Sequence, residues 1–430
     1  MNKLEKIQKF VLSNKNFLFL WFAQIITQSA VSIVTILVGI LSDEGVISSS
    51  AKQSSASIGI IIDLAMFPAL FIAPIAGAVA DRVKRKKIML LSNIIRFIFL
   101  FVYTIFHGWN NLLYSYSLVL FSSIVLQFFI PAEGGLIPKL VEKKYILLAN
   151  SLFSLTVYST MAVGVTLSGL ILNIFGIKMT FAVCSLFFII SSVLLLFVKV
   201  KETPVKREEG EKKLFKIFPS IIRDVKEGII YSFKNKKLRF ALIHLFLLQV
   251  VALILVTIVF RIGNEIYGVS PRTAGVVVFA PIIIGLLTGV VTLNTFFRNM
   301  RRPKLIWLGT IFSSISFGFM FLISIGNGIL SELFLDEVIA TLSLIGIGIS
   351  IPFLLIPAQA LIYERTKTDY RSRVLGIWQA LTSSFASIVA TVFGFINDEI
   401  GNISVAILQI VIVDLIYSAI ILFLLKKRKI

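Results

Sequence analysis

Residues 57–87 read SIGIIIDLAMFPALFIAPIAGAVADRVKRKK, an apolar run of 24 residues that ends in a short basic cluster. The only charged residue inside the run is Asp63. About 20 apolar residues in helical form span the hydrocarbon core of a bilayer. In hydrocarbon the backbone amides must be hydrogen-bonded within the protein, which a helix achieves. The stretch therefore predicts a membrane-spanning helix, with its basic end outside the hydrocarbon.

The same pattern recurs along the whole chain of 430 residues, of which 57% are hydrophobic and 15% charged. A soluble globular protein carries about 25% charged residues, so a soluble enzyme is excluded. The runs do not alternate in polarity, which excludes a membrane β-barrel. We expect an all-α membrane protein with twelve transmembrane helices, near residues 17–41, 57–80, 88–106, 112–130, 149–173, 178–198, 239–262, 272–296, 304–326, 337–361, 374–396 and 404–425.

The formal net charge of +20 is explained by topology. If both termini are cytoplasmic, 37 of the 42 Lys and Arg residues lie in cytoplasmic segments and three in outer loops. This asymmetry follows the positive-inside rule. We therefore expect a multi-pass protein of the inner or plasma membrane with cytoplasmic termini. Anionic lipids on the cytoplasmic side are the natural counter-charge, and we expect no nucleic-acid partner.

The twelve segments divide into two halves of six. We expect an N-terminal bundle (1–199), a cytoplasmic linker (200–237) and a C-terminal bundle (238–430). Residues 214–233 of the linker have apolar residues at helical spacing, which predicts an interfacial amphipathic helix. Short matches relate the halves, such as IPAE at 130–133 and IPAQ at 356–359. They indicate two pseudo-symmetric bundles.

The segment 77–87, GAVADRVKRKK, is the strongest local motif. Gly77 and the small residues near it would permit close helix packing. Asp81 could cap a neighbouring helix, and the arginines could reach Glu133. Contacts of this kind would form in one conformation and break in another, as in a cytoplasmic gate. The alternative is that the basic residues only hold the loop on the cytoplasmic side. The gate candidates are Gly77, Asp81, Arg82, Arg85, Lys86 and Glu133.

This segment resembles the signature loop of the major facilitator superfamily, G-x-L-A-D-R-x-G-R-K. The positions that match are Gly77, Ala80, Asp81, Arg82, Arg85 and Lys86; Val79 and Lys84 stand where the leucine and the second glycine would be. Residues 131–138 and 148–152, together with Arg96, resemble the branch of macrolide-efflux-like and enterobactin-exporter-like proteins. The resemblance implies a secondary transporter of the drug:proton antiporter type. In it two six-helix bundles would rock around a cavity lined by helices 1, 4, 7 and 10.

Ionisable residues inside apolar helices are functional candidates because each costs free energy unless it is paired or hydrated. We consider Asp63 and Asp414 as proton-coupling residues. The alternatives are a solvated acid near the outer mouth for Asp63, and a structural ion pair or an inward-snorkelling side chain for Arg96. Neutral polar residues on the cavity helices mark the substrate path or bond between helices. The cavity candidates are Gln24, Gln28, Arg96, Gln127, Gln249 and Gln359.

The chain lacks a phosphate-binding loop and the HExxH and CxxC motifs. We therefore expect neither an enzyme nor a metal site, and no cofactor, with a proton gradient as the energy source. The hypothesis is a monomeric, proton-coupled exporter of amphipathic small molecules or drugs. Two alternatives stay open. One is uptake or flipping of a lipid or metabolite by the same fold, and the other is a membrane sensor or scaffold that transports nothing.

Overall fold

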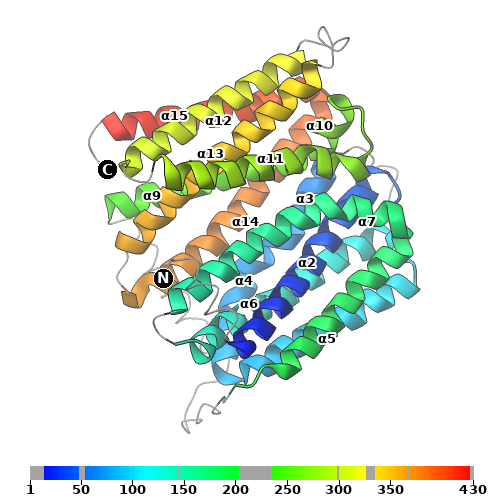
Figure 1. The fold of residues 1–430 in the computed structure, drawn as a ribbon. Coiled ribbons are helices and arrows are strands. Elements are labelled where there is room, and N and C mark those ends of the chain that lie inside the picture. Colours follow the sequence, from blue (N-terminus) through cyan, green and yellow to red (C-terminus); the bar gives the residue numbers. More distant parts are fainter. Residues whose placement is uncertain are drawn as a thin grey trace. The chain divides into compact units, whose positions relative to one another are not determined.

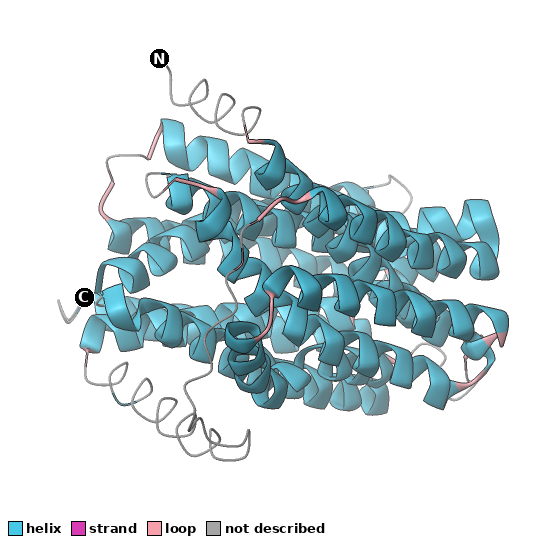
Figure 2. Ribbon diagram, turned by 90° about the horizontal axis from the view of Figure 1, so that it is seen from below, coloured by secondary structure: helices cyan, strands magenta, loops and turns pink. Residues whose placement is uncertain are grey.

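The computed structural model describes residues 14–47, 54–142, 145–200, 202, 230, 235–297, 300–325, 335–365 and 368–426. Within these ranges all regular secondary structure is helical (Figure 2). Contacts divide the chain into two compact units. Unit 1 holds the described residues of 1–52 and 64–211, and unit 2 holds those of 53–63 and 212–430.

Unit 1 is built from five long or medium helices and one short turn of 3₁₀ helix (Figure 1). These are α2 (Lys15–Asp43), α4 (Pro68–Arg82), α5 (Arg85–Ile105), η2 (Gly108–Asn110), α6 (Leu112–Leu140) and α7 (Ile146–Phe197).

Unit 2 contains the other described helices. The last residues of α3, from Leu64 to Met66, are assigned to unit 1, and the remaining helices lie wholly within unit 2. These are α3 (Ser55–Met66), α9 (Lys236–Thr257), α10 (Val259–Glu265), α11 (Pro271–Thr295), α12 (Arg302–Ile325), α13 (Leu335–Arg365), α14 (Thr368–Ile400) and α15 (Ile403–Lys426).

The helix predicted at 57–80 is interrupted. It forms α3 and α4, with a turn at Phe67 and Pro68 as the first residue of α4. Proline has no backbone N–H and is tolerated in the first turn of a helix, so it starts α4 without leaving a donor unpaired. The division between the units falls just before this break, after Asp63.

The start of α3 is held by α14 within unit 2. The carboxylate of Asp398 accepts hydrogen bonds from the hydroxyl of Ser54 (2.7 Å) and from the amides of Ser55 (2.8 Å) and Ala56 (3.0 Å). The first amides of a helix have no partner inside the helix, and a negative charge there is favoured. Asp398 thus acts as the N-terminal cap of α3.

The helix α7 contains both segments predicted at 149–173 and 178–198. At Gly176 the backbone has φ 72° and ψ 172°, which is not helical. Phe153 and Leu195 belong to the same buried cluster, although 42 residues of straight helix would separate them by about 60 Å. The chain therefore reverses direction at Gly176, and α7 is a hairpin of two helices.

Eleven helices in the described part are long and apolar enough to cross a membrane. The difference from the predicted twelve arises at α7, where two predicted segments are joined. The helices α6 and α13 also continue beyond the predicted ends at 130 and 361, through residues expected to start loops. Of the predicted amphipathic helix at 214–233, only Ile230 lies among the described residues.

A polar contact inside unit 1 joins α2, α5 and α7. The hydroxyl of Ser191 donates to the carbonyl of Ala23 (2.9 Å) and lies 2.7 Å from the hydroxyl of Thr27. The amide of Asn93 donates to Ser191 (2.9 Å) and to Thr27 (3.2 Å). Hydrogen bonds between helices fix their relative rotation where the surroundings are otherwise apolar. These bonds therefore fix which sides of α2, α5 and α7 face one another.

Candidate functional site

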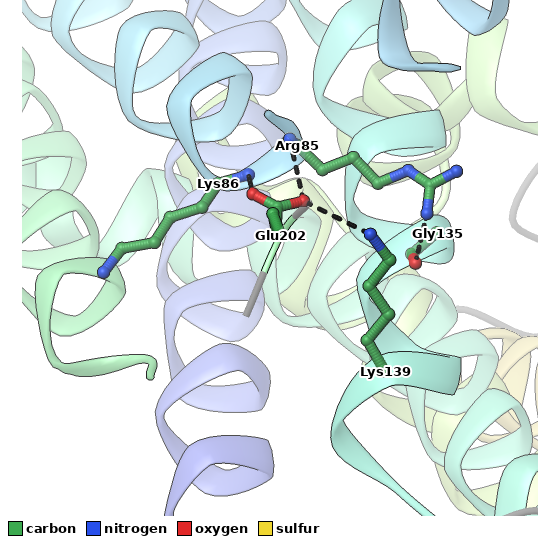
Figure 3. A network of polar contacts seen from close by, with 5 residues as sticks. All are labelled: Arg85, Lys86, Gly135, Lys139 and Glu202. Carbon is green, nitrogen blue, oxygen red and sulfur yellow. Dashed lines mark hydrogen bonds and ion pairs between the residues drawn. The ribbon is translucent and has the colours of Figure 1, made fainter. Parts of the chain in front are cut away.

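The ends of α4, α5 and α6 that carry Arg82, Arg85, Lys86 and Lys139, together with the C-terminal end of α7, form what we call the basic end of unit 1. Figure 3 shows the polar contacts there. The carboxylate of Glu202 accepts hydrogen bonds from the backbone amides of Arg85 (3.0 Å) and Lys86 (3.2 Å). It also lies 3.8 Å from the ammonium of Lys139 on α6. Glu202 therefore caps the first turn of α5 and ties it to α6.

Whereas Glu202 binds a helix N-terminus, the side chain of Lys86 binds a helix C-terminus. Its ammonium donates to the carbonyls of Leu196 (2.8 Å) and Val198 (2.9 Å), at the C-terminus of α7. Free carbonyls at a helix C-terminus carry partial negative charge and favour a cation. Lys86 thus links the start of α5 to the end of α7.

Arg85 reaches α6 through its side chain. One guanidinium nitrogen, Nη1, donates to the carbonyl of Gly135 (2.7 Å) (Figure 3). A Cβ atom at Gly135 would lie 2.4 Å from the Nε and Cζ atoms of Arg85. The guanidinium can reach this carbonyl because residue 135 has no side chain.

We predict that Gly135→Ala displaces the Arg85 guanidinium and breaks its bond to the carbonyl. The adjacent Gly134→Ala is the matched control, because a Cβ there meets nothing within 4 Å. The loss of a charged hydrogen bond together with local overpacking should lower the free energy of unfolding by about 1–3 kcal/mol. Thermal unfolding of the two purified variants in detergent measures the difference. Equal unfolding temperatures for the two variants would contradict this role of Gly135.

The other predicted gate residues lie as follows. A Cβ at Gly77 would meet nothing within 4 Å, so this glycine does not allow a close contact in this structure. Arg82 is exposed at the end of α4, and the side chain of Asp81 lies outside the described part. Glu133, the expected partner of the arginines, is 5% exposed, and its Oε1 has no hydrogen-bond partner. The carboxylate at the basic end that binds the start of α5 is Glu202.

A small cavity of about 280 Å³ opens beside Glu202. Three lysines and two apolar side chains line it with that glutamate: Lys84, Lys86, Lys87, Leu90 and Val200. It belongs to the same network, so any change at Glu202 also changes its wall.

The four predicted cavity residues of unit 1 are all buried. Gln24 on α2 donates to the carbonyl of Phe153 (3.4 Å), while its Oε1 has no partner. Gln28 and Gln127 are each 7% exposed. Arg96 on α5 is 1% exposed and has the phenyl rings of Phe129 and Phe188 on its guanidinium. Among the described residues, none of the three guanidinium nitrogens of Arg96 has a hydrogen-bond partner.

The two predicted coupling acids both lie in unit 2. Asp63 on α3 accepts a hydrogen bond from the hydroxyl of Thr391 on α14 (2.7 Å), and its Oδ1 is buried without a partner. Asp414 on α15 is 2% exposed. It accepts hydrogen bonds from the hydroxyls of Ser313 and Ser314 on α12. The structure does not bring the two acids into one hydrogen-bonded group.

A second buried contact lies one helical turn from Asp414. The hydroxyl of Tyr417 lies 2.6 Å from Nδ1 of His244 on α9, and Nε2 of His244 lies 2.9 Å from the carbonyl of Leu354 on α13. The imidazole therefore joins α9, α13 and α15. The predicted cavity residues of unit 2, Gln249 and Gln359, are half-buried.

Sequence reasoning missed Glu202, Gly135, Thr391 and the two serines of α12. Glu202 is the first acid after the sixth predicted helix, in a stretch rich in lysine. An acid beside a helix start is a recognisable capping signal, but the helix that Glu202 caps begins 117 residues earlier. The serines of α12 could have been found only through the acid that they face.

Comparisons with known proteins agree with this architecture. The sequence profile of the Major Facilitator Superfamily matches residues 20–391. The uncharacterized MFS-type transporter YfiS of Bacillus subtilis is 27% identical over 353 residues, 79% of this chain and 78% of that protein. The uncharacterized MFS-type transporter YkuC of the same organism is 26% identical over 231 residues, 53% of this chain. That match spans about half (52%) of YkuC.

A third relative is the lysophospholipid transporter LplT of Photorhabdus laumondii, 24% identical over 243 residues, 55% of this chain and 58% of LplT. A solved POT family transporter in complex with 5-aminolevulinic acid has a TM-score of 0.70 at 14% identity, with 96% of both chains covered. A point mutant of the nucleoside transporter NupG gives a TM-score of 0.68 at 14% identity, with 95% of this chain and 99% of that chain covered. These structures confirm the predicted all-α transporter fold.

Proposed function

Because the chain belongs to the Major Facilitator Superfamily and is a secondary transporter rather than an enzyme, we propose that it exports amphipathic small molecules in exchange for protons. The observation that carries the proposal is the set of ionisable groups inside the spans. Asp414 is 2% exposed, and one oxygen of Asp63 is buried without a partner. Buried ionisable residues in membrane helices mark proton or substrate paths.

The proposal includes an orientation and a gate. The distribution of Lys and Arg supports cytoplasmic termini in the inner or plasma membrane, with the basic end of unit 1 facing the cytoplasm. The contacts of Arg85 and Lys86 at that end would hold the helices of unit 1 together while the gate changes state. Gln24, Gln28, Gln127, Gln249 and Gln359 would contact substrate. The broad apolar character needed for amphipathic ligands is supported by the 38 phenylalanines.

The test is flux from proteoliposomes with ethidium, a lipophilic cation, as the probe. We expect an imposed pH gradient to accelerate ethidium movement and a protonophore to abolish the acceleration. The double variant Asp63→Asn with Asp414→Asn should lose most of the response to the gradient. As controls we choose Asp336→Asn and Glu399→Gln, which change a half-buried acid at the start of α13 and an exposed acid at the end of α14. Ethidium flux that ignores the gradient would rule out proton coupling for this probe.

A second function is favoured by one observation, the similarity to a lysophospholipid transporter. In that case the chain would move a lysophospholipid between leaflets or across the membrane. A fluorescent lysophospholipid in the same proteoliposomes, quenched from outside by dithionite, distinguishes the two. Protein-dependent movement of this lipid without ethidium flux would favour the lipid function. Ethidium flux alone would favour the exporter.

A further inference from the structure

Arg96 is a buried charge without a hydrogen-bond acceptor. Its side chain is 1% exposed, and its Nε, Nη1 and Nη2 atoms all lack partners. An arginine side chain stays protonated under all ordinary conditions. Isolated burial of such a charge is unfavourable, so proteins pair buried charges. The surroundings of Arg96 must therefore provide compensation that is not a hydrogen bond in this structure.

Part of that compensation comes from two aromatic rings. The Cζ atom of Arg96 lies 5.6 Å from the ring centroid of Phe129 on α6 and 5.6 Å from that of Phe188 on α7. Both rings are almost completely buried. The face of an aromatic ring attracts a cation, and the attraction is stronger when water is excluded. We call Phe129 and Phe188 the aromatic clamp.

The opposite charge is available one helical turn away from Phe129. Glu133 follows it by four residues on α6, so the two side chains lie on the same face of the helix. Glu133 is 5% exposed, and its Oε1 has no hydrogen-bond partner. Arg96 and Glu133 are close enough to interact electrostatically, yet no hydrogen bond joins them. The buried acid and the buried base therefore lie near each other without a hydrogen bond between them.

Other charged groups near α6 are accounted for separately. On α5, Arg85 binds the carbonyl of Gly135, and Lys86 binds the end of α7. Glu202, after α7, binds the start of α5. The buried polar residues Gln24 and Gln28 of α2 are neutral, and α4 carries Asp81 and Arg82 at its C-terminal end. The electrostatic partner of Glu133 in the structure is Arg96.

From this geometry we infer that Glu133 carries a coupled proton and that Arg96 alternates between two positions. When Glu133 is ionised, Arg96 bonds directly to its carboxylate. When Glu133 holds a proton, Arg96 rests in the aromatic clamp, as it does here. One proton from water adds to one carboxylate oxygen and forms an O–H bond, and release reverses the step, with no other covalent change. The inference rests on the proposed proton-coupled function and adds a coupling residue in unit 1.

The two positions of the Arg96 guanidinium would couple protonation of Glu133 to the conformation of unit 1. A protonation event can change a conformation only if the two states bind the proton differently. The ion pair draws α5 toward the Glu133 turn of α6, whereas the clamp holds α5 between α6 and α7. Proton uptake at Glu133 would thus change the packing of three helices of unit 1.

The test uses infrared difference spectra of the purified full-length protein in liposomes, recorded between acidic and alkaline buffer. We expect a carbonyl band from a protonated buried carboxyl that disappears in Glu133→Gln. The band should remain in Asp336→Asn and in Glu399→Gln, the control variants that remove a carboxyl outside the proposed proton path. Glu133→Asp, which keeps a carboxyl group, should restore a titrating band. A full band in Glu133→Gln would overturn the inference.

Ethidium flux separates this inference from the proposed function. With Glu133→Gln we expect the pH-gradient stimulation of flux to fall at least tenfold, while Phe188→Leu should weaken it through the clamp. If flux of the unchanged protein ignores the gradient but the infrared band still requires Glu133, the proposed exchange with protons fails and the titration of Glu133 stands. If flux follows the gradient equally in Glu133→Gln and in the unchanged protein, Glu133 is not the coupling residue.

Discussion

Glu202→Ala is expected to loosen the basic end of unit 1 more than any other single exposed or half-buried change there. The carboxylate of Glu202 binds two backbone amides in the first turn of α5 and lies 3.8 Å from Lys139. Its side chain is 7% exposed, so water cannot fully replace it. The loss of an N-terminal cap together with charge-assisted hydrogen bonds should lower the free energy of unfolding by about 2 kcal/mol.

The most direct measurement is hydrogen exchange of the amides at Arg85 and Lys86. In Glu202→Ala these amides should exchange faster, because they lose their acceptor. Glu202→Gln should give an intermediate rate, since an NH₂ group that only donates replaces one of the two carboxylate oxygens that accept from these amides. Glu399→Ala, which removes an exposed acid at the end of α14, should leave the exchange at α5 unchanged. Unchanged exchange in Glu202→Ala would show that the cap does not control this helix end.

The helices themselves were predictable because the length of an apolar run fixes whether it can cross a bilayer. The ends of these helices were harder to predict. Helix α6 continues to Leu140 through Pro131 and Pro138, where apolarity alone predicts an end near residue 130. The break between α3 and α4 occurs inside an unbroken apolar run, at Phe67. Hydropathy measures transfer to lipid and does not register where a backbone turn interrupts a helix.

The sequence identifies several residues of the basic end correctly, but it does not identify the groups that they bind. Arg85 and Lys86 do lie in one network, but each binds backbone carbonyls, of Gly135 and of Leu196 and Val198. Every residue has a carbonyl, so a sequence carries no signal for such a partner. The sequence places the charged Glu133 at the foot of its predicted helix, within reach of the arginines, and this position predicts a role in the gate. Its burial beside Arg96 depends on how α5 and α6 pack, which a sequence pattern alone does not specify.

The second large effect is expected in unit 2, when both serines that bind Asp414 are removed. Ser313→Ala with Ser314→Ala deletes the hydroxyls that donate to the two carboxylate oxygens. Asp414 is 2% exposed, so water does not take their place. A buried charged group without hydrogen bonds costs more than a neutral one. We expect the free energy of unfolding to fall by about 3 kcal/mol or more.

A matched control lies on the same helix. The hydroxyl of Ser316 donates to the carbonyl of Phe312 on its own helix and not to Asp414. Ser316→Ala should therefore change the thermal unfolding temperature in detergent only slightly. A third variant isolates the cause: if the loss arises from the unpaired carboxylate, Asp414→Leu added to the double serine variant should recover most of the stability. This follows because replacing all members of a buried polar group costs less than leaving one of them unpaired.

The same variants test whether Asp414 contributes to coupling or only to packing. The double serine variant retains the carboxyl group, whereas Asp414→Asn retains both serines and removes the charge. If Asp414 exchanges protons, Asp414→Asn should lower the pH-gradient stimulation of ethidium flux while unfolding near the temperature of the unchanged protein. If Asp414 serves packing alone, ethidium flux should fall in proportion to the loss of stability in the double serine variant, in its combination with Asp414→Leu and in Asp414→Asn. The reason is that the serines and the acid then act as one structural unit. Flux and stability measured on the same preparations therefore assign the acid of α15 to one role or the other.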